Sequence, residues 1–124
     1  MIKKLAVYGT LRNGKRKTCK VDGYSLVYPG HYNYPAAIVD NNSKGMVVEV
    51  MDVGQEDIDN YDVYEGIDTG LYDRRVVTAY DGEKKVDAWM YTAGPLLLQH
   101  KNVFELVPKQ DWLSKKSKKK IALT

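Results

Sequence analysis

The residues best suited to chemistry near the N-terminus form the loop Tyr8-Gly9-Thr10-Leu11, which follows a short apolar run. A strand that turns sharply at a glycine can leave several backbone N–H groups facing one concavity, and such a nest binds an anionic group or a developing oxyanion. Gly9 would also let the backbone approach a ligand closely, because it has no side chain. An ordinary turn from a strand into a loop has the same composition, so the residues alone leave both interpretations open.

A second candidate is Glu65, near the end of a segment with the pattern of an α-helix over residues 54–66. Ile58, Tyr61 and Glu65 stand at i, i+3 and i+7, so they share the face that would pack against a sheet. Gly66 is placed to end the helix in a left-handed cap. A carboxylate on a buried face is costly unless it is paired or hydrated in a cavity. Glu65 is therefore a candidate acid or base.

The loop after this helix brings further polar groups toward Glu65. Gly66 and Gly70 allow a turn that leads into the next strand, so that Tyr72 and Arg74 would enter the same neighbourhood. A carboxylate, a phenol and a guanidinium would then converge. By itself, however, a glutamate at a helix end is equally typical of a surface residue, or of an ion-pair partner for Arg74 or its neighbour in the sequence.

Alternation of apolar and polar residues, together with β-branched content, predicts strands separated by clusters of Gly, Pro, Asn and Asp. The expected strands cover residues 3–8, 24–28, 36–39, 45–51, 73–80 and 86–92. The last two should form an antiparallel hairpin, because Asp81-Gly82 between them tolerates positive φ. The chain is therefore predicted to be β-rich with one main helix, and Trp112 is expected to anchor a short helix near the C-terminus.

Length and composition predict one domain over residues 1–113 and a basic tail over residues 114–124, within a chain of 124 residues. Residues 1–100 contain 12 Lys and Arg against 14 Asp and Glu, whereas residues 101–124 contain 7 against 2. The tail either contacts nucleic acid or an anionic surface, or is a solvated chain end. No segment has the length and apolarity of a membrane span, and the N-terminus lacks the pattern of a secretory signal.

Cysteine and histidine content excludes several kinds of site. Cys19 is the single cysteine, so no internal disulfide can form, and a reducing, cytoplasmic location is expected. Cys19 has no nearby histidine to complete a nucleophilic pair, and we interpret it as a free thiol. His31 and His100 are isolated, and no spacing resembles a metal site.

In combination, the motifs are more specific than any one of them. YGTLR-x-G near the N-terminus, Gly30 with Tyr34-Pro35, and Y-E-G followed by Y-x-R occur in that order. Over residues 5 to 92 the sequence resembles the γ-glutamylcyclotransferase-like (AIG2-like) family. The resemblance implies an α+β fold: a small mixed β-barrel with one main helix and a short C-terminal helix, in which the YGTL loop and the glutamate face one cavity.

The resemblance also implies a reaction in which a γ-glutamyl compound is cyclised to 5-oxoproline and its amine or amino acid is released, with no cofactor. The attacking nitrogen belongs to the substrate, so the enzyme supplies orientation and proton transfer rather than a nucleophile. Glu65 would be the general acid and base, with its pKa raised by burial.

The same resemblance assigns the other site residues. The amides of Gly9, Thr10 and Leu11 would hold the substrate carboxylate or the oxyanion, and Tyr8 and Tyr72 would close the walls. Arg74 would orient or balance a carboxylate, because a guanidinium that stays protonated is a poor general acid.

The sequence departs from the family pattern in two places. Met46 stands where many relatives carry a glutamate, and we expect this change to alter the cavity edge rather than the ring-closing chemistry. The short, lysine-rich C-terminal end would leave the pocket more open. Two other functions therefore remain as hypotheses: a non-catalytic protein of the same fold that binds a small anionic metabolite, and an interaction protein that works through the basic tail.

Overall fold

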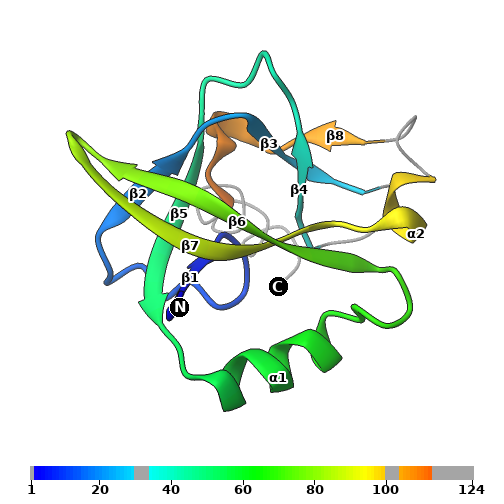
Figure 1. The fold of residues 1–124 in the computed structure, drawn as a ribbon. Helices are drawn as coiled ribbons and strands as arrows, with labels where there is room; N and C mark the ends of the chain where they lie inside the picture. Colours follow the sequence, from blue (N-terminus) through cyan, green and yellow to red (C-terminus); the bar gives the residue numbers. More distant parts are fainter. Residues whose placement is uncertain (1, 30–33, 100–103, 113–124) are drawn as a thin grey trace, which may run out of the picture.

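The computed structural model describes residues 2–29, 34–99 and 104–112, and its centre is a closed five-stranded barrel (Figure 1). The strand order is β1-β5-β2-β6-β7, with antiparallel pairing except where β1 meets β7 in parallel and closes the barrel. The strands are β1 (Lys4–Val7), β2 (Thr18–Val21), β5 (Met46–Asp52), β6 (Tyr72–Asp81) and β7 (Lys84–Ala93). The prediction of a small mixed barrel is confirmed.

A second, three-stranded sheet lies beside the barrel in the order β4-β3-β8 (Figure 1). Its strands are β3 (Tyr24–Tyr28), β4 (Ala36–Val39) and β8 (Glu105–Leu106), all antiparallel to their neighbours. After β8 a short 3₁₀ turn, η2 (Pro108–Gln110), returns the chain to β3, where the Gln110 side-chain amide donates to Leu26 O at 2.9 Å. Trp112 follows it and is buried in the core.

The six predicted strands are confirmed as β1, β3, β4, β5, β6 and β7, but β2 and β8 were missed. β2 (Thr18–Val21) lies in a lysine- and arginine-rich stretch whose charges hide its alternation. It is nevertheless paired on both sides, with β5 and with β6. Pairing with distant strands, rather than local pattern, makes this segment a strand.

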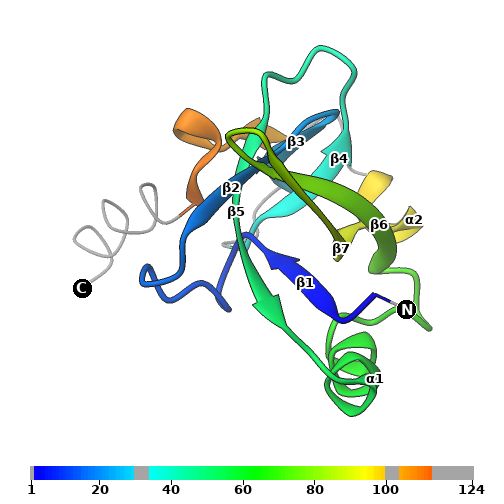
Figure 2. The same ribbon diagram turned by 60° about the vertical axis from the view of Figure 1, so that its left-hand side comes forward.

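The main helix, α1 (Gln55–Tyr64), lies below the barrel in both views, on the side where β1 begins (Figures 1 and 2). Ile58 is its one fully buried residue among those described, and Tyr61 is partly buried on the same face. Gly66 has φ +69° and ends the helix, with its amide donating to Val63 O and that of Ile67 to Asp62 O, both at 3.1 Å. The predicted left-handed cap is confirmed.

A short helix, α2 (Pro95–Leu98), follows β7 and is tied to the loop after α1. The Gly94 amide donates to Leu71 O at 2.9 Å, and the Leu96 amide donates to Gly70 O at 3.0 Å. A Cβ at position 94 would lie 2.3 Å from Gly70 O, so only glycine permits this approach. The loop over residues 66–71 is thereby fixed at its C-terminal end.

No helix in the described part of the chain is long and apolar enough to cross a membrane. The helix and basic tail predicted after Trp112 fall on residues 113–124, outside the described residues, as do Gly30, His31 and His100.

Candidate functional site

A cavity of about 310 Å³ opens between the end of β1, the end of α1 and the first part of β6. A volume of this size suits a small metabolite. All residues predicted to catalyse or to bind substrate, apart from Arg74, line this cavity, and they are Tyr8, Gly9, Thr10, Leu11, Glu65 and Tyr72. The two segments identified in the sequence therefore meet at one place, although more than fifty positions separate them in the chain.

The loop after β1 forms one wall of the cavity. The Arg12 amide donates to Gly9 O at 3.0 Å, which closes a turn over residues 9–12. The amides of Gly9, Thr10 and Leu11 donate no hydrogen bond to any residue that the structure describes, and all three residues line the cavity. A Cβ on Gly9 would lie 3.2 Å from Pro35 Cγ, so a glycine lets this loop pack closely against the opposite wall.

Glu65 occupies the C-terminal cap position of α1, with its amide donating to Tyr61 O at 2.7 Å. Its side chain is half-buried, and burial raises its pKa to about 7. No residue in the described ranges forms a hydrogen bond or ion pair with its carboxylate. An unpaired carboxyl group that titrates near neutrality is suited to accept and return a proton.

Tyr8 and Tyr72 lie close to Glu65, and their side chains are held in place through their hydroxyl groups. The hydroxyl of Tyr8 donates to Tyr91 O and that of Tyr72 to Pro35 O, both at 2.8 Å. Burial raises the pKa of both phenols, and the nearby Glu65 charge raises each further. These phenols stay neutral, and because their protons are already donated, they can offer a ligand only acceptor oxygens.

Tyr91, which sequence reasoning missed, also lines the cavity and connects it to Arg74. Its hydroxyl donates to Asp62 Oδ1 at 2.8 Å, and Arg74 Nε lies 3.1 Å from the same oxygen. The Arg74 guanidinium also stacks over the Trp89 ring, 4.2 Å from its centroid. Arg74 thus balances the Asp62 carboxylate behind the cavity wall, and the alternative in which it pairs with Glu65 is wrong.

The remaining walls come from residues that precede the predicted ones in the chain and from one further segment before β4. They are Ala6, Val7, Tyr34, Pro35, Tyr64 and Leu71. Met46 is not among them, because it is fully buried inside the barrel core. The expectation that Met46 alters the cavity edge is therefore wrong: its side chain alternates with that of Val47 and points to the barrel interior.

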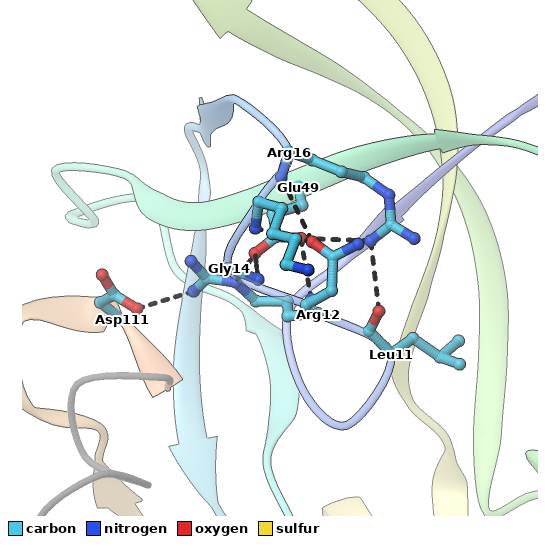
Figure 3. Close-up of polar contacts among 8 residues, drawn as sticks. Leu11, Arg12, Gly14, Arg16, Glu49 and Asp111 are labelled. Atoms are coloured by element: carbon cyan, nitrogen blue, oxygen red, sulfur yellow. Dashed lines mark hydrogen bonds and ion pairs between the residues drawn. The ribbon is translucent and has the colours of Figure 1, made fainter.

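Sequence reasoning also missed Glu49, a fully buried carboxylate on β5 that binds the loop after β1 (Figure 3). Its oxygens accept from Arg12 Nε at 2.9 Å and from Arg16 Nη1 and the amides of Asn13 and Gly14, each at 3.1 Å. Burial alone would raise its pKa, but the bonds from Arg12 and the two amides and the Arg12 charge together lower it. A charged residue inside the apolar run Val47-Val48-Glu49-Val50 was the available signal.

Metal chemistry finds no support in the described residues. Within 2–29, 34–99 and 104–112 no group of three or more His, Cys, Asp or Glu side chains is placed to hold an ion. Cys19 is a free thiol on β2, half-buried and outside the cavity.

Comparison with known proteins adds a family and a fold. A family model described as "Gamma-glutamyl cyclotransferase, AIG2-like" matches residues 5–114. A search of curated proteins found no match.

Several solved structures share the fold at low sequence identity. An AIG2-like protein from Mus musculus has a TM-score of 0.63 at 20% identity, covering 78% of this chain and 82% of its own. A structure titled "Gamma-glutamyl cyclotransferase" has a TM-score of 0.60 at 14% identity, covering 84% of this chain and 69% of its own. An uncharacterised protein from Pyrococcus horikoshii has a TM-score of 0.61 at 22% identity and covers 94% of both chains.

Proposed function

This chain belongs to the AIG2-like γ-glutamyl cyclotransferase family, and from that premise we propose that it cyclises a γ-glutamyl amine or γ-glutamyl amino acid to 5-oxoproline. The observation that carries the proposal is Glu65: a half-buried carboxyl group with a pKa of about 7, which lines the same cavity as the amides of Gly9, Thr10 and Leu11. In this proposal Glu65 is the acid and base, and the neighbouring amides are the donors for a developing negative charge.

The first step is activation of the substrate's own amine. At neutral pH the α-amino group is an ammonium, and ionised Glu65 takes one of its protons. The neutral nitrogen then attacks the γ-carbonyl carbon, so that a ring C–N bond forms and the carbonyl oxygen becomes an oxyanion. In this proposal the amides of Gly9, Thr10 and Leu11 stabilise that oxyanion or the substrate α-carboxylate.

The second step expels the leaving amine. Protonated Glu65 gives its proton to the leaving nitrogen, the ring nitrogen loses its extra proton to the freed carboxylate, and the original C–N bond breaks. The products are 5-oxoproline and the amine, which takes up the last proton from Glu65 or water. Because both reacting groups belong to one molecule, holding it in the ring-closing conformation supplies much of the rate, with effective molarities of about 10⁵–10⁸ M for well-oriented cases.

We assign the other side chains supporting roles in this proposal. Tyr8 and Tyr72 are neutral walls whose oxygens can accept from the substrate ammonium. Arg74 holds Asp62, which in turn holds Tyr91 at the cavity wall. A protein that only binds metabolites has no need of an unpaired, half-buried carboxylate, which favours catalysis over the non-catalytic hypothesis.

The test is a panel of γ-glutamyl amines and γ-glutamyl dipeptides incubated with the protein, with 5-oxoproline detected by mass spectrometry. The matched variants are Glu65→Gln and Glu56→Gln, since Glu56 is an exposed residue on the same helix and outside the cavity. We expect product from the wild type and from Glu56→Gln, and little from Glu65→Gln. No product from the whole panel, or full activity in Glu65→Gln, would overturn the proposal.

The cytoplasmic location and any role of the basic tail remain predictions from the sequence. The single cysteine supports the first, and the charge distribution supports the second.

A further inference from the structure

The loop that contains the backbone amides of Gly9, Thr10 and Leu11 has to cross over one strand. β5 lies between β1 and β2 in the barrel, so the connection from the end of β1 to the start of β2 passes over β5. The register shows where it crosses: Val7, the last residue of β1, and Thr18, the first of β2, both pair with Glu49. Glu49 is therefore the residue of β5 that lies directly beneath the loop.

Glu49 binds this loop through both of its carboxylate oxygens. One oxygen accepts from Arg12 Nε at 2.9 Å and the Gly14 amide at 3.1 Å, and the other accepts from the Asn13 amide and Arg16 Nη1, both at 3.1 Å. All four donors belong to the five residues that follow Leu11. One buried carboxylate can accept all four only when the loop adopts a single conformation.

Two further contacts connect this cluster to its surroundings. Arg16 Nη1 also donates to Leu11 O at 3.3 Å (Figure 3). One guanidinium thus joins Glu49 to Leu11, the last residue of the Gly9–Leu11 segment, which we call the cradle. Arg12 Nη1 lies 2.7 Å from Asp111 Oδ1, which ties the same loop to the segment after η2. The position of the Gly9–Leu11 amides thus depends on contacts made outside the cavity.

We infer that Glu49 is a positioning residue, which holds the amides of Gly9, Thr10 and Leu11 in the geometry that binds the substrate's negative charge. This inference rests on the proposed function and adds to it that a carboxylate away from the substrate sets the substrate's affinity. Glu49 does not line the cavity and takes no part in proton transfer.

The sharpest test compares two neighbouring cations in the loop. Arg16→Met removes the guanidinium that joins Glu49 to Leu11 O, but Glu49 still accepts from Arg12 and from two backbone amides. Lys17→Met removes an equal charge one residue later, from a side chain that pairs with Asp81 rather than Glu49. Both side chains reach solvent, with relative exposures of 30% and 75%, so both variants should fold.

We expect Arg16→Met to lower kcat/KM for a γ-glutamyl substrate by about tenfold, mainly through KM, and Glu49→Gln by up to about 100-fold, because small misplacements of binding groups have effects of that size. Lys17→Met should match the wild type. The pH profile of kcat should keep its apparent pKa in Arg16→Met, since Glu65 is untouched. Equal kinetics for Arg16→Met and Lys17→Met would overturn the inference.

A second measurement needs no substrate and therefore separates this inference from the proposed function. The Arg12 amide closes the turn of the cradle onto Gly9 O, so its hydrogen exchange, followed by NMR, reports the cradle's order. We expect the Arg12 amide to exchange about tenfold faster in Arg16→Met than in the wild type, and at the wild-type rate in Lys17→Met. Val48→Ala, on the same strand but inside the barrel, controls for lost stability in Glu49→Gln. If Val48→Ala and Glu49→Gln lose equal stability and speed the exchange of the Arg12 amide equally, Glu49 has only a structural role and the inference fails.

Discussion

Two glutamates, Glu65 and Glu49, lie near the loop after β1, and their surroundings give them opposite properties. Glu65 lies at the cavity, half-buried and without a partner among the described residues, and burial raises its pKa to about 7. Glu49 lies beneath the loop, fully buried, and its donors hold its pKa below the ordinary value in spite of burial. Environment, rather than residue type, makes one carboxylate a candidate acid and base and the other a fixed anion.

The comparison predicts the largest effect on activity at Glu65. Glu65→Gln should lower kcat by about 10²–10⁴-fold, the range for loss of a general acid and base. Because this variant removes an unpaired, partly desolvated charge, its thermal stability at about pH 8 should equal or exceed that of the wild type. Initial rates of 5-oxoproline release and a melting curve measure the two effects. A variant that loses activity by unfolding would contradict the contrast with Glu49.

The largest effect on stability is predicted at Glu49. Glu49→Gln removes one of the two anions that pair with buried Arg12, whose side chain is 3% exposed, and leaves it with Asp111. Breaking a buried ion pair from one side costs about 3–5 kcal/mol. Urea unfolding at about pH 7 should show a lower midpoint than for Glu65→Gln. If both variants unfold at the wild-type midpoint, the Glu49 cluster contributes nothing to the fold.

The two groups should also differ in pH dependence. Activity should rise as Glu65 ionises, with an apparent pKa of about 7, and should be about 100-fold below its plateau two pH units lower. A pH profile of kcat/KM on the wild type measures this limb. If the limb instead falls near the ordinary value for a glutamate, Glu65 is not the titrating base.

Stability should change with pH in opposite directions for the two carboxyl groups. Glu65 has a raised pKa in the folded state, so it binds more protons folded than unfolded, and its contribution falls as pH rises from about 4.5 to about 7. Glu49 has a lowered pKa, so its contribution is present above about pH 4.5 and is lost in acid. Unfolding free energies of the wild type and Glu65→Gln at about pH 5 and pH 8 test the first sign. A constant difference between them would contradict it.

The smallest effect is predicted at Arg74, which lies behind the cavity wall. Arg74→Met removes a partly exposed ion pair with Asp62, and such pairs contribute up to about 1 kcal/mol. We expect a small loss of stability and little change in kcat/KM, with Arg75→Met as the matched control because Arg75 is an exposed neighbour on β6. Loss of activity in Arg74→Met alone would mean that Arg74 contacts the substrate.

Much of the candidate site was predictable because its signals are local. The helical phase of Ile58, Tyr61 and Glu65 follows from the period of an α-helix, and Gly66 ends the helix through its own backbone freedom. The strand before Tyr8 likewise follows from alternation. Family resemblance then joined the two segments, and the cavity contains both.

The parts that were missed depend on partners distant in sequence. β2 is a strand because β5 and β6 pair with it, which its basic composition does not indicate. Tyr91 reaches the cavity because β7 crosses the barrel beside β1, and Arg74 pairs with Asp62 rather than Glu65 because of where α1 docks. Met46 lies in the barrel core because of the register of β5.

The sequence by itself determined the candidate residues for chemistry: the turn after Val7 and the carboxylate at the end of α1, since both arise from contacts within a few residues. Tertiary structure alone decided the environment and the charge state of each carboxylate. The charge state of a carboxyl group depends on its burial and on the number of its hydrogen-bond donors. The loop that crosses β5 supplies the donors to Glu49, and Tyr8, Tyr72 and Tyr91, from three separate segments, line the cavity at Glu65. Glu49 and Glu65 have the same intrinsic chemistry, but their pKa values differ because Glu49 accepts from four donors and Glu65 lines a cavity without a partner among the described residues.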